Sequence, residues 1–509
     1  MPEINKHIEQ EISLLYQGLK DVLYFTGKDK NIDFYVSSLT EFNPYYSTKE
    51  IEQWILSINQ EQYFHVTHIP LNEMDKWSFD ENTGDLKHDS GGFFSISGLH
   101  VETNWGNTSS WSQPVIHQPE IGILGIITKK VNGILYFLLQ AKAEPGNINT
   151  YQLSPSVQAT RSNYLQLHGG KSTLYLEYFI DHPQVTVLID QLQSEQGARF
   201  YHKRNRNIIV RLPDDYELEL GQNHRWLTLG QIVKLAQKDN VVNMDTRSVI
   251  SSISFGPETI TSKTAINEDL LAKCLGDFSL VTKSNTGFGV KLMVSDHPNT
   301  TALHTFDEIL KKIVKRKFEC ELNVHLIPLN KIETWIQTPK EIYHPERRFF
   351  SVIGVHVEAM NREISSWDQP IIKQDQPGII GFIVKEIDGV LHFLTQLKLE
   401  SGVMDLLEIS PTVQCITSNY SDKMIPKFVE EMMHRKNLET IIDVYQSEEG
   451  GRFYKESNQN IILLAGASFQ VEEDQDFIWM TMSQLKQFIK FNNFLNVEAR
   501  SLLAFLPTI

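Results

Sequence analysis

The chain has 509 residues, of which 41% are hydrophobic and 22% charged, and its formal charge at pH 7 is −16. This length predicts two large domains or several small ones, and the composition is typical of a globular protein rather than a disordered one. Because the balance of charge is acidic, DNA and RNA are poor partners for the surface as a whole, and any bound phosphate has to meet a local basic cluster.

The sequence also argues against a membrane or secreted protein. It contains no run of the roughly 18 apolar residues that a spanning helix needs, and residues 1–15 are too polar for a secretory signal, so we expect a cytoplasmic protein. The three cysteines, Cys274, Cys320 and Cys415, are far apart and form no CxxC pair. That spacing argues against a disulfide framework and against a thiolate zinc site.

One unit of about 250 residues occurs twice along the chain. The matching blocks are FFSISGLHVE (93–102) with FFSVIGVHVE (349–358), SSWSQP (109–114) with SSWDQP (365–370), NGILYFLLQAK (132–142) with DGVLHFLTQLK (388–398), LSPSVQ (153–158) with ISPTVQ (409–414), QSEQGARFY (193–201) with QSEEGGRFY (446–454), and WLTLGQI (226–232) with WMTMSQL (479–485). The unit is too long for a solenoid repeat, so it indicates duplication of a whole domain. We expect a first repeat at 1–254, a polar linker at 255–280 and a second repeat at 281–509.

The local patterns predict an α+β fold in each half. Residues 121–140 form a predicted β-hairpin, closed by Asn132 and Gly133. Apolar residues recur every three or four positions, as in helices, at 51–58, 267–275, 306–317 and 427–436. Each half therefore combines a meandering or mixed sheet with helices.

Several familiar catalytic signatures are absent from the sequence. There is no GxGxxG, no GxxxxGKS/T, no HExxH and no GxSxG. Dinucleotide oxidoreductases, P-loop proteins, zinc metalloproteases and α/β-hydrolases thereby lose their main support.

Polar side chains gather at the end of the strand ILYFLLQAK and in the segment that follows it. Strand alternation places Gln140 and Lys142 on one face. The segment after the strand adds Glu144, Asn147, Gln158, Thr160, Arg161, Asn163, Tyr164 and His168. Such donors and acceptors suit a pyrophosphate, a base and sugar hydroxyls, although an ordinary solvated loop would also contain many of them.

Two other motifs supply candidate ligand contacts. In SSWxQP, Trp111 and Trp367 could stack on a nucleobase with Gln113 and Gln369 reading its edge, but a core tryptophan is the simpler interpretation. His100 and Glu102 share one strand face and form a possible acid/base pair or a plain polar surface. Arg199, in QSEQGARFY, could bind substrate or fix a turn by pairing with a nearby glutamate.

Taken together, FFSxxGxHVE, SSWxQP, QAKAEPGN, LSPSVQATRSNY and QSEQGARFY resemble the NDP-hexose 2,3-dehydratases of bacterial deoxysugar biosynthesis, over nearly the whole chain. The resemblance implies a dTDP-4-keto-6-deoxyhexose substrate, loss of water across C2 and C3, and neither a redox cofactor nor a metal. It also implies a Nudix-like fold in each repeat, a homodimer, and a separate 3-ketoreductase that consumes the 3,4-diketo product. Neither half has the REx₂ExxEE-like acidic box of Nudix pyrophosphohydrolases.

This chemistry assigns roles to the polar residues. The C4 ketone acidifies the C3 proton, so the enzyme needs a base at C3, a donor at the carbonyl oxygen and an acid for the departing C2 hydroxyl. The candidate bases are Glu144, Glu102 and His168, and the candidate donors are Lys142, Tyr164 and Arg161.

The two halves differ at these positions. Lys142 and Gln158 persist as Lys398 and Gln414, and Tyr164 persists as Tyr420, whereas Thr417 replaces Arg161 and Met424 replaces His168. We therefore expect the first repeat to be catalytic and the second to hold a vestigial nucleotide site or to serve dimerisation. The pair Arg362 and Glu363, which the first half lacks, argues for the reverse assignment.

Two other functional classes stay open at this point. A non-catalytic nucleotide-sugar-binding protein, or another dTDP-sugar enzyme such as an isomerase, would carry the same polar block. A purely structural tandem protein would leave that block unexplained.

Overall fold

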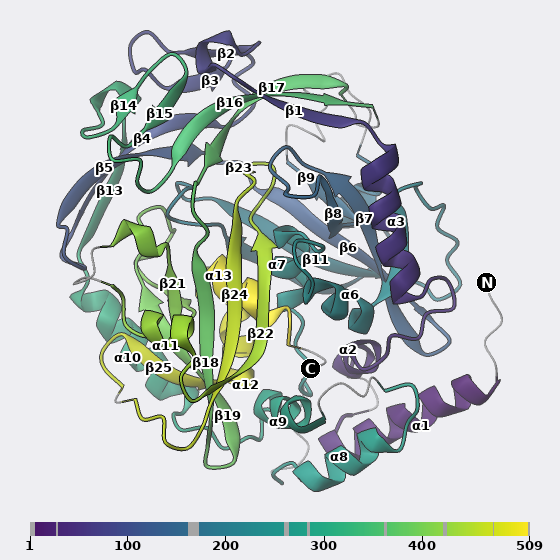
Figure 1. The fold of residues 1–509 in the computed structure, drawn as a ribbon. Helices are drawn as coiled ribbons and strands as arrows, with labels where there is room; N and C mark the ends of the chain where they lie inside the picture. The colour runs from purple at the N-terminus through teal and green to yellow at the C-terminus, as the bar shows by residue number, and fades with distance from the viewer. Residues whose placement is uncertain are drawn as a thin grey trace.

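A computed structural model gives the structure of the protein, shown in Figure 1. It describes residues 6–26, 29–160, 173–258, 264–281, 286–360, 364–420, 425–471 and 473–506. No helix in these ranges is both long enough and apolar enough to cross a bilayer.

Each repeat contains a mixed sheet of the same layout, which we call its core sheet. In the first repeat the core sheet consists of β6 (Gly122–Val131), β7 (Ile134–Ala143), β8 (Tyr151–Pro155), β9 (Val157–Ala159), β10 (Thr186–Ser194), β11 (Arg204–Leu212) and β12 (His224–Thr228). In the second it consists of β18 (Ile379–Ile387), β19 (Val390–Lys398), β20 (Glu408–Ser410), β21 (Val413–Cys415), β22 (Leu438–Ser447), β24 (Ser457–Ala465) and β25 (Phe477–Thr481). One pair in each, β6 with β11 and β18 with β24, is parallel, and the others are antiparallel. The duplication and the α+β class are confirmed.

The hairpin expected at 121–140 is formed by β6 and β7. Asn132 and Gly133 close it with φ of 50° and 86°, the positive values that a tight two-residue hairpin turn requires. Asp388 and Gly389 make the same turn between β18 and β19, with φ of 50° and 82°.

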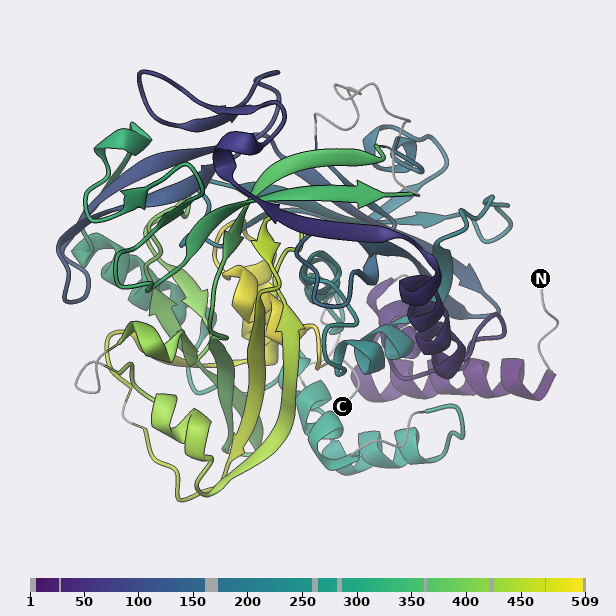
Figure 2. The same ribbon diagram turned by 45° about the horizontal axis from the view of Figure 1, so that its top comes forward.

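Two further sheets, which we call the arm sheets, cross one side of the molecule and come forward in Figure 2. One consists of β2 (Trp77–Phe79), β3 (Leu86–His88), β4 (Ser95–Thr103), β5 (Ser110–His117) and β13 (Leu322–Ile327). The other consists of β1 (Phe64–Ile69), β14 (Ile336–Gln337), β15 (Glu341–Tyr343), β16 (Ser351–Ala359), β17 (Ser366–Lys373) and β23 (Phe453–Tyr454).

The arm sheets exchange strands between the repeats. Strand β1 of the first repeat pairs with β16 of the second, with Phe64 opposite Ala359. In return β13 of the second repeat pairs with β4 of the first, with Leu322 opposite Thr103. Each arm sheet is therefore incomplete without a strand from the other half, which the repeat pattern did not predict.

Helices flank the core sheets and fill the space between them (Figure 1). They are α1 (Lys6–Leu23), α2 (Asn31–Ser38), α3 (Thr48–Glu61), α5 (Glu177–Ile180), α6 (Leu229–Ala236), α7 (Met244–Ser251), α8 (Glu268–Gly276), α9 (Thr286–Asp296), α10 (Phe306–Glu319), α11 (Val429–His434), α12 (Met482–Ile489) and α13 (Val497–Leu503), with short 3₁₀ turns at Leu71–Glu73, Leu329–Lys331 and Thr417–Asn419. The four predicted helices correspond to α3, α8, α10 and α11. Capping boxes begin α3 and α10 at matching places, with Ser47 and Glu50 in one and Thr305 and Glu308 in the other.

Helices α7 and α13 meet between the two core sheets. Arg247 of α7 donates to the Ser447 carbonyl of the second repeat at 2.9 Å, and Arg500 of α13 donates to the Ser194 carbonyl of the first repeat. Both arginines are almost fully buried, and their hydrogen bonds hold the repeats together at the centre of the molecule.

Candidate functional site

The SSWxQP motif of each repeat holds the loop formed by its QSExGxRFY motif. The Trp111 indole donates to Gln113 Oε1 at 2.9 Å, and Gln113 Nε2 donates to the Ala198 carbonyl at 3.0 Å. In the second repeat, Trp367 donates to Gln369 at 2.9 Å, and Gln369 donates to the Gly451 carbonyl at 2.8 Å. Both ends of each glutamine amide are thus already paired, and these residues position the loop.

Each of these loops lies against the other repeat. The Gly146 amide donates to the Gly450 carbonyl at 2.7 Å, and the Gly402 amide donates to the Gly197 carbonyl at 2.7 Å. The loop of the second repeat therefore reaches the segment that follows Lys142, and the loop of the first repeat reaches the segment that follows Lys398. Each candidate site is built from both halves of the chain.

A cavity of about 700 Å³ opens between the second core sheet and the loop of the first repeat, and we call it the second-repeat cavity. Its lining includes Trp111, Gln113 and Arg199 from the first repeat and Lys398, Gln414 and Tyr420 from the second. This volume is in the usual range for a small-molecule site. Seven residues singled out from the sequence thus lie together here: His100, Trp111, Gln113, Arg199, Lys398, Gln414 and Tyr420.

Glu400 lies in this cavity with both carboxylate oxygens engaged. Oε1 accepts from Gln414 Nε2 at 2.9 Å, and Oε2 accepts from the Gly197 amide at 2.9 Å. The nearby Lys398 donates to the Gln414 carbonyl at 2.8 Å and is 4.0 Å from Glu400. Arg199 stacks on the ring of Phe350 at 4.4 Å and donates from Nη2 to Gln374 Oε1 at 3.0 Å. Its buried Nε has no hydrogen-bond partner among the described residues.

The matching residues of the first core sheet are Lys142, Glu144 and Gln158, which we call the first-repeat cluster. Glu144 Oε1 accepts from Lys142 Nζ at 3.2 Å and from Gln158 Nε2 at 2.8 Å. Its other oxygen, Oε2, is buried and has no hydrogen-bond partner in the described part of the chain. Glu144 therefore keeps one acceptor free, unlike Glu400.

Further acidic groups surround both sites. Burial raises the pKa of Asp245, in α7, well above its usual value, and the nearby charges of Glu449 and Glu144 add to this effect. Glu498, at the matching position of α13, lines the second-repeat cavity, and burial next to Glu400 raises its pKa well above the usual value in the same way. Carboxyl groups held in the protonated form are suited to act as acids.

The other residues predicted for the site in the first repeat do not form one group in the described structure. Gln140 donates to the Pro155 carbonyl at 2.9 Å, and Asn147 donates to the Thr150 carbonyl at 2.8 Å. Thr160 directly follows β9. Arg161, Asn163, Tyr164 and His168 lie outside the described residues, as do Arg362, Glu363 and Met424.

His100 and Glu102 lie on an arm sheet, on the strand face that the alternation predicted. His100 Nε2 is 3.7 Å from Glu102 Oε1, and Asn323 donates to the same carboxylate at 3.1 Å. His100 lines the second-repeat cavity, whereas the Glu102 side chain is 56% exposed on a different sheet from Glu144.

Sequence reasoning missed five charged residues: Asp245, Glu400, Glu449, Arg452 and Glu498. The signal for two of them was present, because the blocks NMDTRS and NVEARS both carry a carboxylate two residues before an arginine. The signal for Glu449 was the exchange of glutamine for glutamate between QSEQG and QSEEG. No group of three or more His, Cys, Asp or Glu side chains among the described residues is placed to hold a metal ion.

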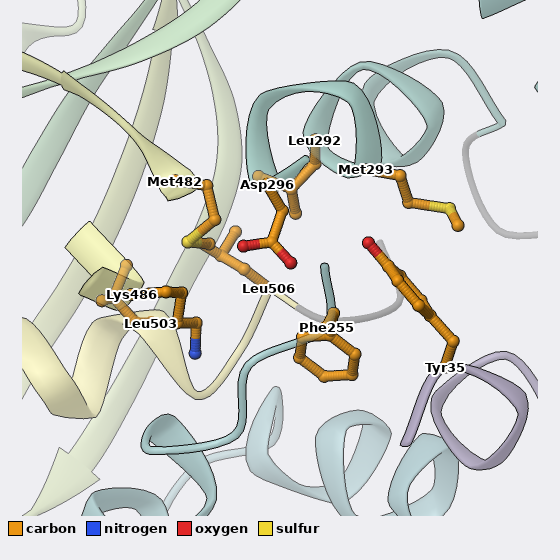
Figure 3. Close-up of a pocket in the computed structure, with 9 residues that line it drawn as sticks. All are labelled: Tyr35, Phe255, Leu292, Met293, Asp296, Met482, Lys486, Leu503 and Leu506. Carbon is orange, nitrogen blue, oxygen red and sulfur yellow. The ribbon is translucent and has the colours of Figure 1, made fainter. Parts of the chain in front are cut away.

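A much smaller cavity, of about 20 Å³, lies between the repeats near Tyr35 (Figure 3). The Asp296 carboxylate and the Tyr35 hydroxyl point into it, and Lys486 donates to the Ser251 carbonyl at 2.6 Å. Burial raises the pKa of Asp296 to about 7 and lowers that of Lys486 to about 8. The space holds one water at most, so it is no substrate site.

A family model described as NDP-hexose 2,3-dehydratase matches residues 48–253 and 306–506. Among curated proteins, the chain is 38% identical over 486 residues to a dTDP-4-dehydro-6-deoxy-alpha-D-glucopyranose 2,3-dehydratase of Saccharopolyspora spinosa, covering 95% of this chain and 96% of the relative. It is 37% identical to a protein of the same description from Amycolatopsis orientalis, covering 90% and 89%, and 35% identical to one from Streptomyces violaceoruber, covering 91% and 97%.

Proposed function

Because the chain belongs to the NDP-hexose 2,3-dehydratase family, we propose that it removes water across C2 and C3 of a dTDP-4-keto-6-deoxyhexose. The product is a dTDP-3,4-diketo-2,6-dideoxyhexose. The reaction takes place at the first-repeat cluster, where Glu144 is the base that removes the C3 proton.

The free oxygen of Glu144 carries this assignment. A general base needs an unoccupied acceptor, and Glu144 Oε2 has no hydrogen-bond partner in the described structure. Gln158 and Lys142 fix the carboxylate through its other oxygen. The matching Glu400 has no acceptor free in this way, because the Gly197 amide occupies its Oε2.

Lys142 supplies the positive charge that the reaction needs. Removal of the C3 proton moves negative charge onto the C4 oxygen, and a preorganised ammonium group in a water-poor site stabilises that charge. The Lys142 side chain is 15% exposed, so little solvent screens it.

The second-repeat cavity suits a nucleotide sugar that is bound without turnover. Arg199 and Lys398 can pair with a pyrophosphate, and Trp111 and Tyr420 offer aromatic faces for a base. The mixed core sheet with flanking helices also supports a Nudix-like fold for each repeat. The 3,4-diketo product requires a 3-ketoreductase to consume it.

The test is turnover of dTDP-4-keto-6-deoxyglucose in deuterated water, with a 3-ketoreductase and NADPH to trap the product for mass spectrometry. The wild type should yield a trapped sugar without the C2 oxygen, and Glu144→Gln should lower the rate by about 100-fold or more. Glu400→Gln is the matched variant of the other repeat, and a smaller loss is expected.

Two results would contradict this proposal. A larger loss in Glu400→Gln than in Glu144→Gln would move the reaction to the second-repeat cavity. Unchanged substrate with the wild type, together with thermal stabilisation by dTDP, would favour the non-catalytic binding protein.

A further inference from the structure

Glu449 belongs to the second repeat but lies beside the first-repeat cluster. A methyl group placed on Gly451 would be 3.5 Å from Glu449 Oε1 and 3.7 Å from Glu144 Oε1. The two carboxylates, from different repeats, therefore flank the same point of the backbone. Both Oε1 atoms thus lie near one position of the chain, although the two glutamates belong to different repeats.

The other site lacks this second carboxylate. The position that matches Glu449 is Gln196, whose Nε2 donates to Glu448 at 2.5 Å. Because each loop serves the opposite repeat, the first-repeat cluster receives a glutamate where the second-repeat cavity receives a glutamine. The two sites thus differ at a group that can hold a transferable proton.

The Glu449 carboxylate has an open hydrogen-bonding capacity. No described residue donates a hydrogen bond to it, and the residue is half-buried. Arg452, in the same loop, is directed elsewhere, since it donates to Gln118 at 3.1 Å and stacks on the ring of Phe94 at 4.1 Å.

The surroundings favour the protonated form of Glu449. Burial is the largest cause that raises the pKa of this carboxyl group, and the charge of Glu144 raises it further, while Arg452, Lys203 and Lys142 act in the opposite direction. A carboxyl group whose pKa is raised keeps a proton that it can donate.

We propose that Glu449 is the general acid of the first-repeat cluster and protonates the C2 hydroxyl as it departs. This inference rests on the proposed function, in which Glu144 is the base. The catalytic pair is therefore assembled from both repeats.

The step balances without a further reactant. Glu144 takes the C3 proton, and the electrons of that bond form an enolate at C3 and C4. When the enolate collapses, a double bond forms between C2 and C3, the C2–O bond breaks, and Glu449 gives its proton so that water leaves. On tautomerisation the C3 hydroxyl returns a proton to Glu449, and Glu144 delivers its proton to C2.

Glu449→Gln tests this assignment, because it installs the residue that the other loop carries at the matching position. The measurements are deuterium exchange at C3 of the substrate, water loss by trapping, and dTDP affinity by calorimetry. We expect water loss to fall by about 100-fold or more, with C3 exchange and dTDP affinity within about threefold of the wild type. In Glu449→Asp, part of the rate of water elimination should return. In Glu144→Gln, both the C3 exchange and the water elimination should be lost.

The outcomes separate the two proposals. The role of Glu449, but not the proposed function, would be overturned by either of two results. Glu449→Gln could retain the loss of water, or it could reduce C3 exchange and loss of water equally. A wild type that neither exchanges C3 nor loses water would overturn the proposed function itself. Glu81→Gln, an exposed change of the same type, controls for the loss of one negative charge.

Discussion

Glu408 and Gln152 occupy matching positions, and each accepts a hydrogen bond from a serine of the other repeat. Ser194 donates to Glu408 at 3.0 Å, and Ser447 donates to Gln152 at 2.8 Å. Only Glu408 can ionise, and burial raises its pKa to about 7 from the ordinary 4.5. An acid whose pKa is higher in the folded state binds its proton more tightly there, so stability is lost as pH rises from about 4.5 to 7.

Glu408→Gln should therefore flatten the pH dependence of stability. The variant removes one titrating group. That group accounts for about 3 kcal/mol of the decrease in the free energy of unfolding between pH 4.5 and 7. Unfolding in urea at pH 5 and pH 7 measures this difference. An unchanged difference in the variant would show that Glu408 keeps its ordinary pKa in the folded protein.

Single residues were predictable where strand alternation and repeat comparison agree. Lys142 follows from the strand pattern and Glu144 from the polar segment directly after it, and their contact is observed at 3.2 Å. Glu449 was not predictable as their neighbour, because the sequence assigns it to the other half. Its position depends on the backbone hydrogen bond between Gly146 and Gly450, which no local pattern encodes.

Where the loop of one repeat contacts the other repeat, the glycines at the contact leave no room for a side chain. A methyl group on Gly402 would be 1.8 Å from the Phe200 carbonyl oxygen, so Gly402→Ala must displace backbone. We expect a loss of about 1–3 kcal/mol or more in the free energy of unfolding, measured in denaturant. The control is Gly276→Ala, where no atom lies within 4 Å, and a comparable loss there would contradict the explanation.

The hairpins and helices were predictable because turn residues and apolar spacing are local signals. The strand exchange was not. Strands β1 and β13 have similar sequences, FHVTHI and LNVHLI, and the edges that receive them, on β16 and β4, are also similar. Pattern alone cannot decide which copy of a strand pairs with which copy of an edge, because both pairings bury the same faces.

The whole molecule should unfold in a single transition in spite of its two repeats. Its largest apolar cluster contains residues from both core sheets, and the exchanged strands and the paired arginines tie the halves together. Calorimetry should give equal calorimetric and van't Hoff enthalpies. Two resolved transitions would contradict this expectation.

Arg247→Met should weaken this connection strongly. It leaves the buried carbonyls of Val242 and Ser447 and the amide oxygen of Gln446 without their donor, at a cost of about 3–5 kcal/mol. The transition temperature measures the loss. Lys315→Met, at a side chain that is 77% exposed, is the control and should change stability little.

The exchange of strands also bears on how the two different centres of this chain, the first-repeat cluster and the second-repeat cavity, could arise. An ancestor with one repeat and the same exchange would complete its arm sheet with a second copy of itself, and symmetry would make both centres identical. Every substitution in such a pair changes both centres at once. Fusion into one gene removes that symmetry, so that Glu449 and Gln196 can differ and one centre can specialise while the other keeps its older composition.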